Sequence, residues 1–120
     1  MSDELAVLDS AVLDELRASV GGDEGFIRDL VTTYLAESPA HMAQVAAAAA
    51  SADTEAIVRP AHTLKSSSAA LGLTRMSAIS KQIEFAGREG RVVDLASLAD
   101  QAQQTWTATV AALKDAGLTS

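Results

Sequence analysis

The chain has 120 residues and a mass of 12.4 kDa, the usual size of one domain with a single core. Its net charge of −7 disfavours nucleic acids and anionic membrane surfaces, and the absence of Cys excludes disulfides and thiolate metal sites. The acidic N-terminus does not resemble a secretory signal, and the longest apolar run, residues 45–50, cannot span a bilayer. We therefore expect a cytoplasmic protein.

Apolar residues spaced three and four apart predict two helices in the first part of the chain. Asp9 caps the first helix, and the pair Gly21–Gly22 ends it. Asp23 opens a longer second helix that contains Pro39. Because proline removes a backbone hydrogen bond, we expect either a bend near residues 36–39 or two short helices.

The same spacing predicts three helices in the second part of the chain. The first runs from roughly Thr54 to Leu71, and we expect Pro60 to kink it. Thr74 caps the next helix, which closes near residues 87–90, and the last helix runs from about Val92 to Lys114.

An all-α fold follows from this pattern and from the low aromatic content of 3%. Four amphipathic helices joined by short turns must lie antiparallel, so we predict an up-down-up-down four-helix bundle with the short first helix packed across it. We place residues 1–120 in this one domain, with residues 1–8 as a flexible N-terminus. Phe26 and Trp106 are expected in the core.

The helix around His62 carries the chemistry. At about 100° of rotation per residue, His62 points away from the inward stripe and should be exposed. Two cations and two small residues share its outward face: Arg59, Lys65, Ser66 and Ala69. An exposed imidazole is a good nucleophile near neutral pH, and phosphoryl transfer suits it. Taken alone, however, a single exposed His is more often an ordinary surface residue.

Two motifs resemble those of the histidine-containing phosphotransfer (HPt) domains of two-component phosphorelays. Residues 61–72, Ala-His-Thr-Leu-Lys-Ser-Ser-Ser-Ala-Ala-Leu-Gly, are similar to the family signature, and residues 83–88, Ile-Glu-Phe-Ala-Gly-Arg, are similar to its second helix motif. The resemblance implies that His62 is the phosphoacceptor, through Nε2, and that Lys65 offsets the charge of the phosphoryl group. The helical layout of the family covers nearly the whole chain.

The same resemblance assigns roles to further residues. Glu84 would hydrogen-bond the imidazole from the neighbouring helix, Arg88 would support it one turn further along, and Gly72 would end the helix that carries His62. Ser66 stands where the signature most often has Gly, and it is still small enough for a partner to dock. Without the motif, Glu84 and Arg88 would be interpreted as a solvated face with a weak ion pair.

The implied function is that of a phosphocarrier. His62 would accept a phosphoryl group from the aspartyl phosphate of one response-regulator receiver domain and pass it to the Asp of another, with a hybrid sensor histidine kinase as a further partner. The surface around His62, with Val58, Arg59, Ser66 and Ala69, would meet the receiver. We expect a monomer without a cofactor, with Mg²⁺ on the receiver, and no autokinase activity, because no phosphate-binding loop is present.

Two alternatives compete with this interpretation. A helical adaptor would bind a partner without any chemistry, so His62→Gln would leave its binding and signalling intact. A metal-dependent enzyme in a helical bundle needs inward Glu-x-x-His pairs, which neither His62 nor His41 completes. A phosphocarrier also needs neutral imidazole, so uptake should fall below the ordinary His pKa of about 6.5.

Overall fold

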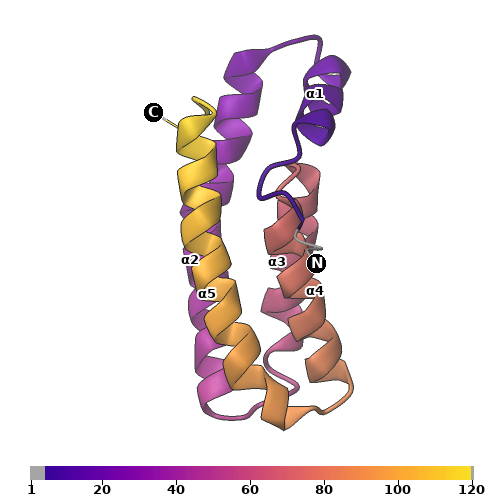
Figure 1. The fold of residues 1–120 in the computed structure, drawn as a ribbon, viewed down its shortest axis with the longest axis vertical. Helices are drawn as coiled ribbons and strands as arrows, with labels where there is room; N and C mark the ends of the chain where they lie inside the picture. Colours follow the sequence, from indigo (N-terminus) through magenta and orange to yellow (C-terminus); the bar gives the residue numbers. More distant parts are fainter. Residues whose placement is uncertain (1–4, 120) are drawn as a thin grey trace.

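The computed structural model describes residues 5–119, which form five helices and no strand (Figure 1). The helices are α1 (Ser10–Ser19), α2 (Glu24–Ala50), α3 (Val58–Ala70), α4 (Thr74–Arg88) and α5 (Val92–Asp115). Helices α2 to α5 run up and down as an antiparallel bundle, in which α3 packs on α4 and both long helices, α2 and α5, close the other side. The predicted all-α bundle with an extra N-terminal helix is confirmed. No helix within residues 5–119 is long and apolar enough to cross a membrane.

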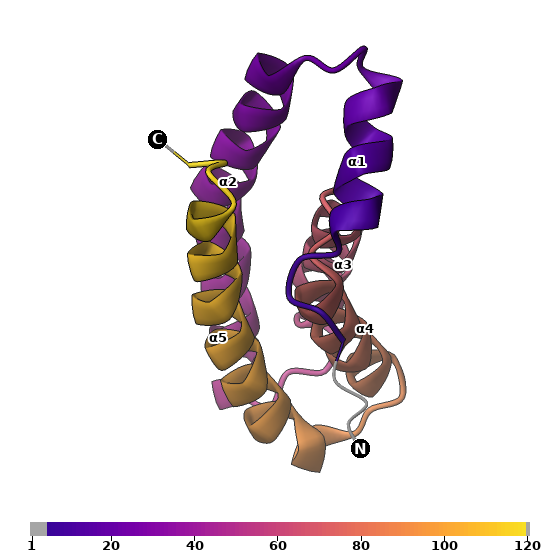
Figure 2. The same cartoon turned by 45° about the horizontal axis from the view of Figure 1, so that its top comes forward.

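Helix α1 lies at the end of the α3–α4 pair instead of across the bundle (Figures 1 and 2). The side-chain oxygen of Asp9 caps it by accepting from the Ala11 amide, as the sequence predicts. The Asp9 amide in turn donates to the Gly72 carbonyl at 2.8 Å, which ties α1 to the α3–α4 turn. Helices α2 and α5 are longer than α3 and α4, so they extend beyond the end of the α3–α4 pair. Helix α1 packs beside this extension and buries Leu13 there.

The N-terminal segment was expected to be flexible over residues 1–8. Residues 1–4 lie outside the described residues. At Leu5, the backbone carbonyl accepts a hydrogen bond of 2.9 Å from Nε of Arg75 on α4. This contact places the start of the described chain along the α3–α4 side of the bundle.

Proline has less effect on the helices than predicted. Helix α2 continues through Pro39, so the alternative of two short helices is wrong. Helix α3 begins at Val58, four residues later than expected, because Asp53 caps a separate turn by accepting from the Glu55 and Ala56 amides. Pro60 therefore falls in the first turn, where backbone amides have no partner within the helix, and the reason to expect a kink disappears.

Helix α4 starts at Thr74, which is its first residue and not its cap. The hydroxyl of Thr74 donates to the Gly72 carbonyl at 3.2 Å instead of accepting from the helix. The cap position belongs to Leu73, whose buried side chain anchors the turn. Burial of an apolar residue thus replaces the expected polar cap.

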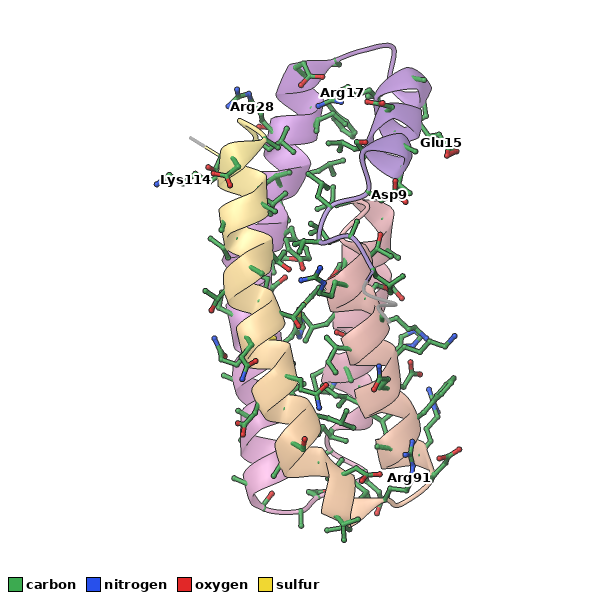
Figure 3. The ribbon with its side chains drawn as sticks, in the orientation of Figure 1. Asp9, Glu15, Arg17, Arg28, Arg91 and Lys114 are labelled. Atoms are coloured by element: carbon green, nitrogen blue, oxygen red, sulfur yellow. The ribbon has the colours of Figure 1, made fainter. Side chains whose placement is uncertain are left out.

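The core is aliphatic and lies between the two helix pairs. Trp106 is half-buried and its ring centroid lies 5.6 Å from that of Tyr34. Phe26 is 45% exposed, so its assignment to the core is wrong: it lies in the first turn of α2, and Ile27 points inward in its place. Charged side chains such as Glu15, Arg28 and Lys114 project from the outside of the bundle (Figure 3).

Candidate functional site

His62 occupies the outer face of α3, with 53% of its side chain exposed. This exposure follows from the helix period, since the inward stripe of α3 and its flanking residues is fully buried: Ile57, Ala61, Leu64, Ser68 and Leu71. Ser68 is satisfied inside the bundle by a 2.8 Å hydrogen bond with the Tyr34 hydroxyl. The face that carries His62 is therefore the one that packing leaves open to solvent and to a partner.

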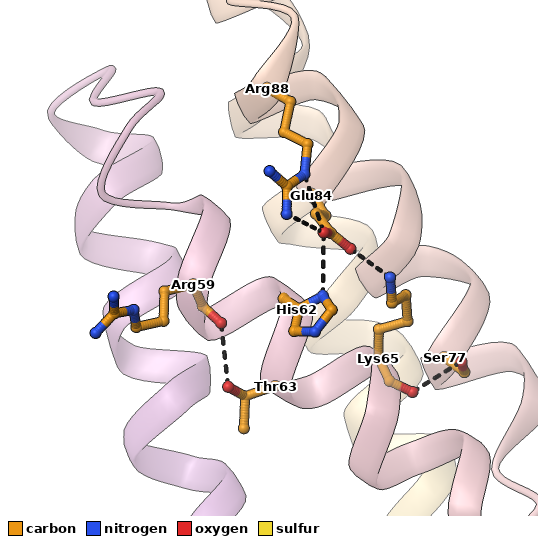
Figure 4. A network of polar contacts seen from close by, with 7 residues as sticks. All are labelled: Arg59, His62, Thr63, Lys65, Ser77, Glu84 and Arg88. Carbon is orange, nitrogen blue, oxygen red and sulfur yellow. Dashed lines mark hydrogen bonds and ion pairs between the residues drawn. The ribbon is translucent and has the colours of Figure 1, made fainter.

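Glu84 faces His62 from α4, and it is the buried centre of a polar cluster (Figure 4). Only 3% of its side chain is exposed. Its Oε2 lies 3.1 Å from Nδ1 of His62, and it also accepts from Nε and Nη2 of Arg88 at 3.0 and 2.7 Å. Its Oε1 lies 2.7 Å from Nζ of Lys65. Both carboxylate oxygens are thus engaged by groups from α3 and α4.

The cluster keeps Glu84 ionised. Burial of the carboxyl raises its pKa, but the hydrogen bonds from Lys65, Arg88 and His62 together lower it by more than burial raises it. The resulting pKa is about 2. An ionised carboxylate can only accept hydrogen bonds, so Nδ1 of His62 must carry the proton that it shares with Oε2. In the neutral imidazole the free lone pair then lies on Nε2, on the exposed side of the ring.

The cations around the imidazole differ from those that the helix pattern suggests. The guanidinium of Arg59 points away from His62, and only its backbone carbonyl takes part in the local network, accepting from Thr63 at 3.1 Å (Figure 4). Lys65 and Arg88 supply the positive charge instead, because both reach Glu84. The expected outward cluster of Arg59 and Lys65 does not form.

The burial of Glu84 is the feature that sequence reasoning did not anticipate. Without the family resemblance, the helical face with Glu84 and Arg88 is interpreted as solvated, whereas Arg88 is exposed and Glu84 is buried. Small residues lie one turn on either side of Glu84, at Ser80 and Gly87, and both are buried. Small residues at this spacing allow a neighbouring helix to approach closely, so they are the signal that could have predicted a buried position between them.

Two shallow grooves flank the second half of α3, which follows His62. One, of about 640 Å³, lies on the α4 side, where Lys65, Ser66 and Ala69 form part of its wall. The other, of about 220 Å³, lies between α1, α2 and α3 and is mostly apolar, with Leu30 and Tyr34 in its lining. Ser66 and Ala69 are exposed between the two grooves, so a partner's backbone can approach α3 closely along this ridge.

The part of the chain that the structure describes holds no group of three or more His, Asp or Glu side chains arranged to bind a metal ion. Glu84, the carboxylate that contacts His62, forms ion pairs with Lys65 and Arg88.

Comparisons with known proteins agree with this geometry. Residues 29–116 match the family model of the Hpt domain. The fold is similar to that of the histidine-containing phosphotransfer protein B from Pseudomonas aeruginosa PAO1, with a TM-score of 0.83 at 22% identity over 93% of this chain and 95% of that one. A comparison with curated protein sequences gives no significant match. Because the family model spans most of the sequence, the chain belongs to the Hpt domain family, the histidine phosphotransfer domains of phosphorelays.

Proposed function

We propose that His62 accepts a phosphoryl group from the aspartyl phosphate of one receiver domain and passes it to the Asp of another. The observation that carries this proposal is the exposed imidazole held at Nδ1 by the buried, ionised Glu84. Such an arrangement presents Nε2 to solvent with its lone pair free. An adaptor without chemistry needs neither the exposed ring nor the buried carboxylate behind it.

The transfer can be written with all bonds balanced. The Nε2 lone pair attacks phosphorus, the bond between phosphorus and the aspartyl oxygen breaks, and the receiver's Asp leaves as a carboxylate. The Nδ1 proton stays in place and continues to donate to Glu84, which offsets the positive charge that the ring acquires. Attack by the Asp of a second receiver reverses these steps. Mg²⁺ belongs to the receiver, and we propose that this chain does not phosphorylate itself.

Lys65 and Arg88 take different parts in this proposal. The side chain of Lys65 is 27% exposed and bonds Oε1, the oxygen that His62 does not use. It can therefore turn toward a phosphoryl group on Nε2 without breaking the contact between His62 and Oε2. Arg88 binds the same oxygen as His62 with two nitrogens, so it supports the carboxylate.

We propose that the receiver docks over α3 and the helices on either side of His62. Ser66 and Ala69 form the close-approach ridge, Val58 and Arg59 border it, and the apolar groove between α1, α2 and α3 adjoins it. The complex is transient, because a carrier must leave one partner to reach the next. The chain acts as a monomer in this scheme.

The proposal is tested by incubating the protein with a receiver that carries a labelled phosphoryl group. We expect uptake by the wild-type chain, no uptake by His62→Gln, and unchanged uptake by the matched control His41→Gln, which removes the other His of the chain. Circular dichroism should show that both variants keep the helical fold. The bound label should be lost in acid and survive base, as a phosphoramidate does.

Label on His62→Gln would contradict the proposal and place the acceptor elsewhere. A His62→Gln variant that takes no label but still binds the receiver and supports signalling would favour the adaptor instead. Loss of uptake in both His variants would show that neither substitution is specific for the site.

A further inference from the structure

Gly87 is buried in the last turn of α4, where the segment that leads into α3 packs against that helix. A Cβ atom at this position would lie 2.7 Å from Cγ2 of Ile57, 2.9 Å from the Thr54 carbonyl oxygen and 2.9 Å from Cγ2 of Val58. One of these three atoms belongs to the backbone, and the other two are β-branch methyls that cannot swing aside. The space beside Gly87 is therefore already filled by the segment that leads into α3.

This contact lies next to the contact between His62 and Glu84. Val58 is one helical turn before His62 on α3, and Gly87 follows Glu84 by three residues on the antiparallel helix α4. The pairs Val58–Gly87 and His62–Glu84 are thus successive contacts along the same helix–helix seam. The distance between the helices at the first contact controls the distance at the second.

We propose that Gly87 is a positioning residue of the phosphotransfer site: its missing Cβ lets α3 come close enough for Nδ1 of His62 to reach Glu84. This inference rests on the proposed function only for its effect on transfer, since the hydrogen bond itself is observed.

The size of the effect follows from the contact distances. Ordinary van der Waals contacts begin at 3.4 Å, so a methyl group 2.7 Å from Ile57 would separate the two segments by about 0.7 Å. The same displacement would lengthen the 3.1 Å contact between His62 and Glu84 to about 3.8 Å, which is too long for a hydrogen bond.

Loss of this hydrogen bond changes the chemistry of the ring. Without Glu84 as an acceptor at Nδ1, the proton of the neutral imidazole distributes between both nitrogens, and a ring protonated at Nε2 has no lone pair there for attack. The ring is also freer to rotate. A misplacement of this size is expected to slow transfer by roughly tenfold to 100-fold.

The test compares Gly87→Ala with Gly25→Ala. Both replace a glycine in a terminal turn of a helix by a better helix former, but a Cβ at Gly25 meets only a carboxylate oxygen of Asp23, at 3.3 Å. Nitrogen-15 NMR of the imidazole at pH 8 measures which nitrogen carries the proton, and the transfer assay measures the rate. We expect the wild type and Gly25→Ala to show Nδ1–H, and Gly87→Ala to show a mixture of both tautomers and slower transfer.

The NMR readout separates positioning from a purely structural role. A Gly87→Ala protein that is less stable but keeps the wild-type tautomer in its folded form would overturn the inference. If this variant is too unstable for NMR, the double variant Gly87→Ala, Val58→Ala takes its place. The second substitution removes the contact with Cγ2 of Val58, one of the three close contacts. A mixture of tautomers in that double variant supports the inference, and the wild-type tautomer overturns it.

If the wild type itself takes no phosphoryl group, the proposed function fails, while the tautomer comparison still decides the role of Gly87.

Discussion

Replacing Glu84 by Gln removes the buried negative charge of the site and leaves the shape of the side chain nearly unchanged. The carboxylate has a pKa of about 2, compared with an ordinary value of 4.5, because the hydrogen bonds from Lys65, Arg88 and His62 outweigh its burial. Each unit of pKa difference between the folded and unfolded chain corresponds to about 1.4 kcal/mol of stability. The ionised form of Glu84 therefore stabilises the fold by about 3 kcal/mol relative to the protonated form.

Solvent reduces this figure somewhat, because 55% of the Arg88 side chain and 27% of the Lys65 side chain are exposed. We expect Glu84→Gln to lower the free energy of unfolding by about 2 to 3 kcal/mol at pH 7. The sign of the pH dependence follows from the lowered pKa. The stabilisation is complete above pH 4.5, the unfolded value, and is lost as the pH falls toward 2, where the carboxylate becomes protonated in the folded chain as well.

Urea unfolding of the wild type and Glu84→Gln, at pH 7 and again near pH 2, measures this difference directly. The gap between the two proteins should shrink toward zero at the lower pH. The matched control is Glu89→Gln, because Glu89 borders the same helix and pairs with Arg91 at 2.8 Å while 62% of its side chain is exposed. This control should change the free energy of unfolding by less than about 0.5 kcal/mol.

The reasoning is refuted if the Glu84→Gln deficit is equally large at pH 7 and near pH 2. Such a result would assign the loss to packing or to an unpaired amide instead of the carboxylate charge. An absent deficit at pH 7 would show that the contacts of Lys65 and Arg88 do no more than offset the cost of burying Glu84.

Four further outcomes are expected. Gly72→Ala should destabilise the fold by about 2 to 4 kcal/mol in urea unfolding, because Gly72 has a φ of +75° and a Cβ would lie 2.9 Å from the Asp9 carbonyl oxygen. Gly21→Ala, with a φ of +67° and open space around it, should cost only about 1 to 2 kcal/mol. Tyr34, the only Tyr, should stay neutral in an ultraviolet titration until near pH 12, because burial raises its pKa to about 12. Pro39→Ala should raise the unfolding free energy by about 1 to 3 kcal/mol by restoring an amide donor inside α2.

Helix positions that depend on one residue's backbone preference could be predicted from the sequence. Asp9 and Asp23 cap α1 and α2, and Gly72 ends the turn after α3 in the left-handed conformation. The exposure of His62 was predictable for a similar reason, since it needs only the helical period and the apolar residues around it. These are local properties, and no knowledge of the neighbouring helices is required.

The positions of Phe26 and Glu84 could not be predicted in this way, because each depends on which helix lies opposite. Phe26 has the spacing of a core residue, yet it lies in the first turn of α2 and is 45% exposed. Glu84 has the polarity of a surface residue, yet it is buried because α3 packs against α4 between Ser80 and Gly87. Helix period gives the face of a residue but not what covers that face.

The two cations on Glu84 bear on how the site keeps its imidazole reactive. Lys65 and Arg88 contact the same carboxylate as His62 and keep it ionised, so Glu84 remains an acceptor for the Nδ1 proton. With the proton held at Nδ1, the lone pair of the neutral ring lies on Nε2, which faces away from Glu84. The two cations therefore act on the imidazole through the carboxylate, by preserving the acceptor that fixes its tautomer and orientation.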